Sequence, residues 1–304
     1  MANTRELRRR IKSVKNTSQI TRAMQMVAAV KMRKAQEQAL NGRPYSENLS
    51  EALERLLPRV DIIAHPLLGG KEIASSSKTP RNDKVGVVLL TTDKGLVGAL
   101  NTNIMRAVIA SHSSSGNVFY TVGKKGRSFV VRTGKDLAAD FENSDLITFR
   151  QAVQLSKLVT ESFLAGEVRE VYLVYPHFVS TLKQEPRKGK LLPISISDIE
   201  YRISEEQKEK RLTINDKRSN EFLYEPNVDA LLDSILIHSV QTRIYQALLE
   251  TKASEHSSRM VAMKNATDNA KELVEDLTLN YNQVRQDSIT REILEISSAS
   301  AAME

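Results

Sequence analysis

Glycine and proline are confined to the middle of this chain, and their distribution constrains the fold more than any other feature. All 12 Gly and all 8 Pro lie between Gly42 and Pro226, so residues 1–41 and 227–304 contain neither. Glycine and proline are the residues that most often end helices. We therefore expect two long helices that flank a turn-rich middle segment. Helices of that length need a packing partner, and each is the nearest candidate for the other.

The two ends also differ in charge. Residues 1–41 carry ten Lys and Arg against Glu6 and Glu37, whereas residues 227–304 carry seven basic and twelve acidic residues. Opposite charge favours pairing of the two helices, although each exposed ion pair is weak at physiological salt. The basic first 34 residues resemble a mitochondrial presequence in composition. The helical pattern continues past them without a small-residue cleavage region, which favours the helix.

Spacing of the apolar residues predicts that the two helices form a coiled coil. Steps of three and four residues, the signature of a left-handed coiled coil, run through the C-terminal segment. Its expected core is Met260, Met263, Thr267, Ala270, Val274, Leu277, Tyr281 and Val284, after which the stripe moves to Ile289, Ile293 and Ile296. The expected stripe of the N-terminal helix is Leu7, Ile11, Val14, Ile20, Met24 and Val27.

The middle of the chain reads as alternating strands and helices. Expected strands are 85–92, 118–122, 129–131 and 168–178, and expected helices are 99–112 and 149–164. This alternation predicts a small α/β layer with a mostly parallel sheet. Residues 70–83 are expected to form a polar loop, and residues 204–220 a charged, solvated excursion.

No motif predicts catalysis, a cofactor or a metal. The chain has no cysteine, which excludes disulfides and thiol chemistry, and its five histidines are scattered. Gly95 and Gly98 form only G-x-x-G, which is not a dinucleotide fingerprint. The basic turn at 123–127 precedes an expected strand, so no helix N-terminus is expected there to hold a phosphate. The apolar run at 85–90 is far too short to span a membrane.

Three sequence blocks resemble the γ subunits of bacterial F-type ATP synthases. They are Ile11–Met32 (IKSVKNTSQITRAMQMVAAVKM), Thr92–Asn101 (TDKGLVGALN), and Ala253–Ala270 (ASEHSSRMVAMKNATDNA), the last followed by Leu277–Glu292 (LTLNYNQVRQDSITRE). The resemblance implies an antiparallel coiled coil of the N- and C-terminal helices plus a central Rossmann-like α/β domain without a cofactor. It divides the chain into an N-terminal helix (1–57), a central domain (58–225) and a C-terminal helix (226–304).

The resemblance also implies a function. The chain would be the central rotor shaft that couples proton flow through the c-ring to ATP synthesis or hydrolysis at the β subunits. It would be a noncatalytic single copy inside a ring of three α and three β subunits, with the ε subunit and the c-ring at its foot. Its expected place is peripheral, on the cytoplasmic face of the bacterial cell membrane, with contact to the membrane only through the c-ring.

Contact residues follow from the motifs as further implications of the resemblance. Contacts with the catch loops of β are expected from Arg285, Gln286, Thr290 and Glu292. Contacts with the acidic lever of β are expected from Met24, Arg8, Arg9, Lys31, Arg33, Lys34 and Lys94. Contacts with the c-ring are expected from Tyr224 and Glu225.

Plainer explanations stay open for each group. Arg285 and Gln286 also fit ordinary exposed helix positions, the basic N-terminal face also fits pairing with the acidic helix alone, and residues 224–226 also fit a simple turn before a helix. Two other classes of protein compete with the rotor. One is a coiled-coil scaffold that binds nucleic acid through its basic helix, and the other is a nucleotide-dependent enzyme built on the middle domain.

Overall fold

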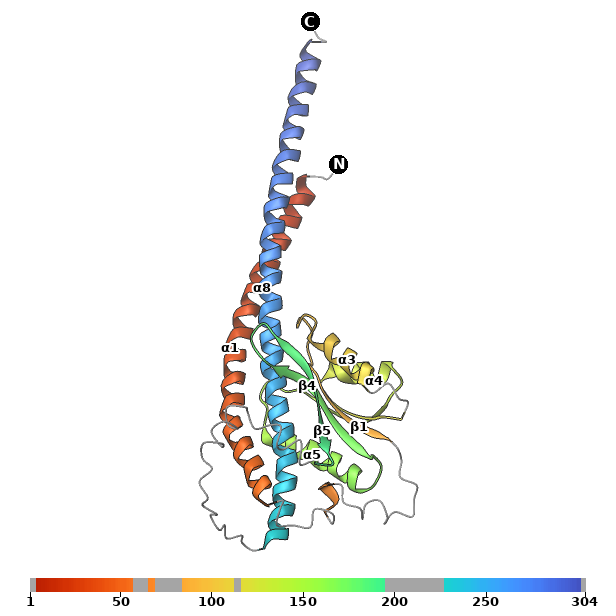
Figure 1. Ribbon diagram of the computed structural model, residues 1–304. Helices are drawn as coiled ribbons and strands as arrows, with labels where there is room; N and C mark the ends of the chain where they lie inside the picture. The colour runs from red at the N-terminus through yellow and green to blue at the C-terminus, as the bar shows by residue number, and fades with distance from the viewer. Residues whose placement is uncertain (1–3, 57–64, 69–83, 112–115, 195–226, 302–304) are drawn as a thin grey trace. The chain divides into compact units, whose positions relative to one another are not determined.

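The computed structural model describes residues 4–56, 65–68, 84–111, 116–194 and 227–301 (Figure 1). The expected polar loop at 70–83 and charged excursion at 204–220 lie outside these residues. Within them, the helices are α1 (Thr4–Leu56), the 3₁₀ helix η2 (Pro66–Leu68), α3 (Leu100–Ser111), α4 (Lys124–Arg132), α5 (Phe149–Leu164) and α8 (Val228–Ala301). The strands are β1 (Val85–Leu90), β2 (Val118–Val122), β3 (Asp136–Phe141), β4 (Glu170–Phe178) and β5 (Gln184–Leu192).

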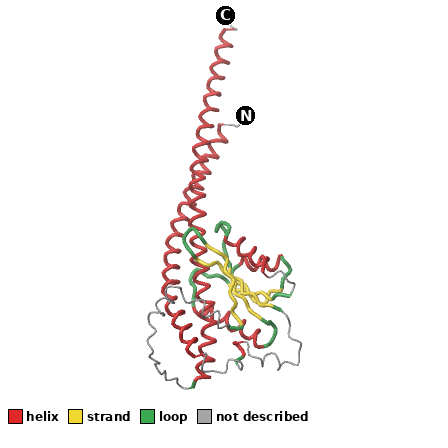
Figure 2. The backbone as a smooth tube through the Cα atoms, in the orientation of Figure 1, coloured by secondary structure: helices red, strands yellow, loops and turns green. Residues whose placement is uncertain are grey.

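Contacts divide the chain into two compact units. The first comprises Met1–Val30 and Arg259–Glu304, and the second comprises Lys31–Ser258. Helices α1 and α8 therefore each contribute to both units. Figure 2 draws the described helices as a red tube. The expected long terminal helices are confirmed, and α1 continues through Gly42 and Pro44 to Leu56.

The first unit is an antiparallel pair of helices. Thr21 bonds to Thr267 through their hydroxyls at 2.7 Å, and Arg8 donates to the Tyr281 hydroxyl at 2.7 Å. All eight residues expected in the seam of α8 are buried or half-buried. The expected stripe of α1 is wrong at two positions, because Ile20 and Val27 are 60% and 57% exposed.

The seam of α1 follows a different set of residues from the expected stripe. The seam runs in steps of four and three through Leu7, Ile11, Val14, Ser18, Thr21, Gln25 and Ala28, all of them buried or half-buried. Small and polar residues thus continue the heptad where apolar ones were expected. Met24 is half-buried beside this line, and Ile20 and Val27 face away from it.

The second unit is built on a five-stranded sheet in the order β3-β2-β1-β4-β5. The first four strands pair in parallel, and β5 pairs antiparallel with β4. Alternate residues of β1 point to opposite faces: Val87 and Leu89 pack with α3 and α4, whereas Val88 and Leu90 pack with α5, α8 and part of α1. The expected mostly parallel α/β layer is confirmed.

One expected strand is a helix. Residues 129–131 were expected to be extended but belong to α4, whose buried residues are Gly126 and Val130. Two adjacent β-branched valines favour a strand locally, but packing of one helical face on β1 and β2 decides the outcome. The helix begins directly after Gly123, so a helix N-terminus is present where none was expected.

Candidate functional site

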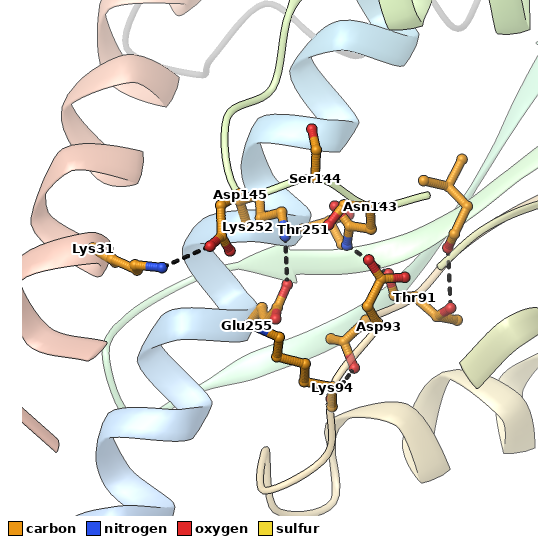
Figure 3. A network of polar contacts seen from close by, with 12 residues as sticks. Lys31, Thr91, Asp93, Lys94, Asn143, Ser144, Asp145, Thr251, Lys252 and Glu255 are labelled. Atoms are coloured by element: carbon orange, nitrogen blue, oxygen red, sulfur yellow. Dashed lines mark hydrogen bonds and ion pairs between the residues drawn. The ribbon is translucent and has the colours of Figure 1, made fainter. Parts of the chain in front are cut away.

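Ligands of doubly wound sheets bind outside the carboxyl ends of the strands, where the strand order reverses. In this protein the reversal lies between β1 and β4. Figure 3 shows polar side chains of the chain itself at this edge, which come from the loops after β1 and β3, from α8 and from α1.

The N-terminus of α4 is capped by the chain itself. The backbone N–H of Lys124 donates to Asp93 Oδ1 at 2.9 Å, that of Lys125 to the Thr92 carbonyl at 3.2 Å, and that of Gly126 to Thr91 Oγ1 at 2.8 Å. These are the first amides of a helix, the groups that bind phosphate in nucleotide-binding folds. A carboxylate, a carbonyl and a hydroxyl of the loop after β1 take that place here.

Thr91 and Asn143 tie the ends of three parallel strands together. Thr91 Oγ1 donates to the Val122 carbonyl at 3.0 Å, and Asn143 Nδ2 donates to the Thr91 carbonyl at 2.7 Å. Thr91 is fully buried and Asn143 is 3% exposed. The strand ends are thus fixed to one another by hydrogen bonds shielded from water, which strengthens them.

Helix α8 reaches this edge through a buried ion pair. Lys252 Nζ donates to the Asn143 carbonyl at 2.9 Å and pairs with Glu255 Oε2 at 3.0 Å. Figure 3 shows both side chains beside the loop after β3. A buried charge is tolerated when it is both paired and hydrogen-bonded, and Lys252 meets both conditions.

Serines of α8 bond to backbone carbonyls of strand β4 and of the surrounding loops. Ser254 donates to the Pro176 carbonyl at 3.0 Å, Ser257 to that of Thr181 at 2.7 Å, and Ser258 to that of Val97 at 2.6 Å. On the same helix, Glu250 Oε2 lies 2.6 Å from His177 Nδ1 of β4. We call the segment Glu250–Ser258 the α8 joint. Sequence reasoning missed it, although the closely spaced serines Ser254, Ser257 and Ser258 were a possible signal.

Two of the lysines expected to contact β lie near this edge. Lys31 Nζ is 2.8 Å from Asp145 Oδ2, and this hydrogen bond lowers the pKa of the Asp145 carboxyl below its ordinary value. Lys94 is exposed on the loop after β1, as are Arg33 and Lys34 on α1. The structure therefore engages Lys31 within the chain and leaves the other three side chains facing solvent.

The residues expected to meet the catch loops lie on α8 in the first unit, and all are exposed. At about 100° per residue, Arg285, Gln286, Thr290 and Glu292 fall within an arc of about 160°. The same arc holds Ile289, Ile293 and Ile296, which are 42%, 61% and 71% exposed. Polar side chains thus flank an apolar stripe on one helical face.

The basic face of α1 differs in detail from expectation. Arg8 donates to Tyr281 and its guanidinium lies 5.4 Å from the centre of that ring, so it braces the two helices of the first unit. Arg9 is exposed. Sequence reasoning missed an outward apolar surface on the same helix, formed by Ile20, Met26, Val27 and Val30, which are 57–72% exposed.

The remaining expected site residues, Tyr224 and Glu225, lie outside the described residues. Over the described ranges, no helix has the length and hydropathy needed to cross a membrane. No cluster of metal-ligating side chains occurs in those ranges either.

Comparisons with known proteins agree with one another. The family model described as ATP synthase matches residues 3–303. The ATP synthase gamma chain of Methylacidiphilum infernorum is 44% identical over the full length of both chains. A chain from the structure of the central stalk and c-ring of the Tetrahymena thermophila mitochondrial ATP synthase is 26% identical, with a TM-score of 0.56. The likeness covers 81% of this chain and 99% of that one.

A second solved structure shares the fold. A chain of the Euglena gracilis mitochondrial ATP synthase, from a structure of its OSCP, F1 and c-ring, has a TM-score of 0.65 at 21% identity. The likeness covers 99% of this chain and 94% of that one. The chain is 44% identical to a curated relative over the full length of both, the family model matches residues 3–303, and the solved structures share its fold. This chain therefore belongs to the gamma chain family of the ATP synthases.

Proposed function

We propose that this chain is the shaft that turns inside a ring of α and β subunits and carries torque between a membrane c-ring and the ATP sites of β. Gamma chains are noncatalytic subunits of the central stalk. The nucleic-acid alternative has no support from the family or the solved structures.

The observation that carries the proposal is the exposed end of α8. From Arg285 to Ala299 every residue is exposed, including three isoleucines on one face. A helix with an unpaired apolar stripe is stabilised when other protein surrounds it, and polar side chains around an apolar centre are the usual anatomy of an interface. A sleeve of apolar loops from the α and β subunits would provide such surroundings.

We propose that Arg285, Gln286, Thr290 and Glu292 contact the catch loops of β from this face. Charge-assisted hydrogen bonds formed at particular rotary angles would couple the angle of the shaft to the state of each β site. The four side chains lie on both sides of the isoleucine stripe. A rotation that brings the side chains of one side to a loop of β therefore moves those of the other side away from it.

Basic side chains support a second contact. Arg9, Arg33, Lys34 and Lys94 are exposed and suit an acidic lever of β, while Arg8 and Lys31 have partners within the chain. Met24 is half-buried beside the exposed Ile20, Met26, Val27 and Val30, and we propose that Met24 meets the lever together with this outward apolar surface.

The wider assembly follows from the proposed role. One copy would assemble with α, β, ε and the c-ring, with Tyr224 and Glu225 at the c-ring. The complex would place the chain at the cytoplasmic face of a bacterial membrane. The division into a helix (1–57), a central domain (58–225) and a second helix (226–304) belongs to the same proposal.

The test replaces the polar flanks of the α8 face in the reconstituted complex. R285A/Q286A should leave assembly intact and lower ATP turnover by about tenfold, the effect of losing roughly 1.4 kcal/mol of charge-assisted bonding. D287A/R291A is the matched control, because it removes two exposed polar side chains from the opposite side of the same helix. Equal turnover in the two variants would refute the proposed contact.

A further inference from the structure

The α8 joint lies in a stretch of helix that is buried on every side. From Ala247 to Ser257 no residue is more than 7% exposed, although seven of these residues are polar or charged. A helix usually buries one stripe and leaves the opposite face in solvent. Here the fold encloses the helix completely, and it does so with polar side chains.

The bonds of the joint leave the helix in several directions. At about 100° per residue, Glu250, Ser254 and Ser257 point to one side, Ser258 lies next to them, and Lys252 points about 160° away from Ser254 on the other side. Their partners come from strand β4, from the turn after it, and from the loops after β1 and β3. The helix is therefore held from opposing sides.

The chemistry of these bonds resists rotation of the helix about its own axis. Four of the acceptors are backbone carbonyls, whose positions are fixed by the strands and loops to which they belong. Turning α8 by one residue would break these bonds together and separate the buried hydroxyls of Ser254 and Ser257 and the Lys252 ammonium from their carbonyl acceptors, which is strongly unfavourable. Lys252 and Glu255 lie on the same helix and would stay paired. The hydrophobic effect itself has no such directional penalty, because it depends on the buried area and not on angle.

We infer that the α8 joint is a torsional lock, which makes helix α8 and the sheet of the second unit turn as one body. The inference rests on the proposed rotor function and names the residues that would pass torque from the helix to the sheet. Ser254, Ser257 and Ser258 act here as positioning residues. Lys252 holds the other side of the helix through the Asn143 carbonyl, and Glu255 pairs with its charge.

The experiment loosens the lock in the assembled ATP synthase and then closes it again with a disulfide. S254A/S257A removes two of the carbonyl bonds. S239A is the matched control, since Ser239 is a buried serine of the same helix, 4% exposed, outside the joint. Reconstituted vesicles report ATP hydrolysis and proton pumping in the same sample.

We expect S254A/S257A to keep hydrolysis within about twofold of the parent complex, while protons pumped per ATP against a gradient fall at least about twofold. S239A should change neither quantity. If hydrolysis and pumping fall in proportion, the joint has only a structural role and the inference is wrong. If the unaltered chain does not assemble with α and β subunits, the proposed function itself fails, which is a different result.

A disulfide provides the rescue. A Cβ at Gly98 would lie 3.7 Å from Ser258 Oγ, so cysteine side chains at these two positions would be in contact, and the chain has no cysteine of its own. The φ of 54° at Gly98 strains any side chain placed there, and the reduced form of the same variant controls for that strain. In G98C/S258C combined with S254A/S257A, oxidation should restore pumping per ATP and reduction should abolish the restoration. Failure of the oxidised form to recover would contradict the lock.

The disulfide alone gives a second measurement should S254A/S257A not assemble. In a chain changed only at these two positions, the oxidised form of G98C/S258C should pump as many protons per ATP as the parent, because the disulfide takes the place of the Ser258 bond that S258C removes. A loss of pumping on oxidation would show that the two must move against each other, and would overturn the inference.

Discussion

Lys252 and Glu255 form an ion pair of 3.0 Å in which each side chain is only 4% exposed. They stand one turn apart on α8, and Lys252 also donates to the Asn143 carbonyl of the loop after β3. Removing two charges from water is costly, and the pair offsets that cost only while both partners are present. Replacing either residue therefore leaves the other as a buried charge without its partner in the pair.

Lys252→Met should destabilise the chain by about 3–5 kcal/mol, since it leaves the Glu255 carboxylate buried without its cation. Urea unfolding followed by circular dichroism measures the change, because the chain has no tryptophan for fluorescence. K252M/E255L should recover most of the loss, since apolar residues of similar size often replace a buried ion pair without cost. A single variant that loses less than about 1 kcal/mol would contradict the burial described here.

Gly123→Ala should be among the most damaging single-methyl additions in the second unit. Gly123 has a φ of 100°, and a Cβ there would lie 2.4 Å from the Thr91 carbonyl oxygen. We expect a loss of about 3 kcal/mol or more, from backbone strain together with displacement of the strand-end network. Gly134→Ala is the control, because its φ is 64° with nothing within 4 Å. It should cost only about 1 kcal/mol. Equal losses in urea unfolding would show that the contact with Thr91 is not limiting.

The two long helices of this fold were predictable because their signals are local. Absence of glycine and proline, together with heptad spacing, identified both long helices and the seam of α8 from Met260 to Val284. The seam of α1 was not predictable from apolar residues alone. Ser18, Thr21 and Gln25 occupy it, because the phase set by Leu7, Ile11 and Val14 persists regardless of polarity.

Elements that depend on tertiary contacts were missed. Strand β5, with the sequence QEPRKGKLL, has no apolar alternation, and it forms through its pairing with β4. The α8 joint was hidden for a related reason, since a serine that donates to a distant carbonyl has no periodic pattern. The contact residues of α8 came from the motifs, and they remain a prediction that the assembled complex must test.

A pH dependence is expected from Glu170. Lys190 Nζ lies 2.9 Å from its carboxylate and the Tyr172 hydroxyl donates to it at 2.8 Å, so these bonds lower the pKa of Glu170. A lowered pKa contributes stability that is present above the ordinary value of about 4.3 and is lost as the pH falls through the folded value. Glu170→Gln should therefore cost about 0.5–1.5 kcal/mol at pH 7, with the difference from the parent shrinking below about pH 4.3.

Glu185→Gln is the control for that measurement. Its partner Lys183 lies 2.7 Å away, but both side chains are more than half exposed, and such pairs contribute little. Urea unfolding of both variants at several pH values separates the two cases. A Glu170→Gln difference that stays constant from pH 7 to pH 3 would show that the carboxylate bonds are not its source.

Reversal of exposed charge on α1 tests the proposed contact with an acidic segment of β. Arg33 and Lys34 are exposed, unlike the ion-paired Lys31, so R33E/K34E should change the surface without disturbing a bond inside the chain. Like charges placed together repel, and we expect protons pumped per ATP to fall by about twofold or more in the reconstituted complex. K125E/R132E is the control, because it reverses two exposed charges on α4. Because the proposed attraction is electrostatic, the defect of R33E/K34E should lessen as salt is raised. An equal loss in both variants, or a defect insensitive to salt, would indicate a general effect of charge and not this contact.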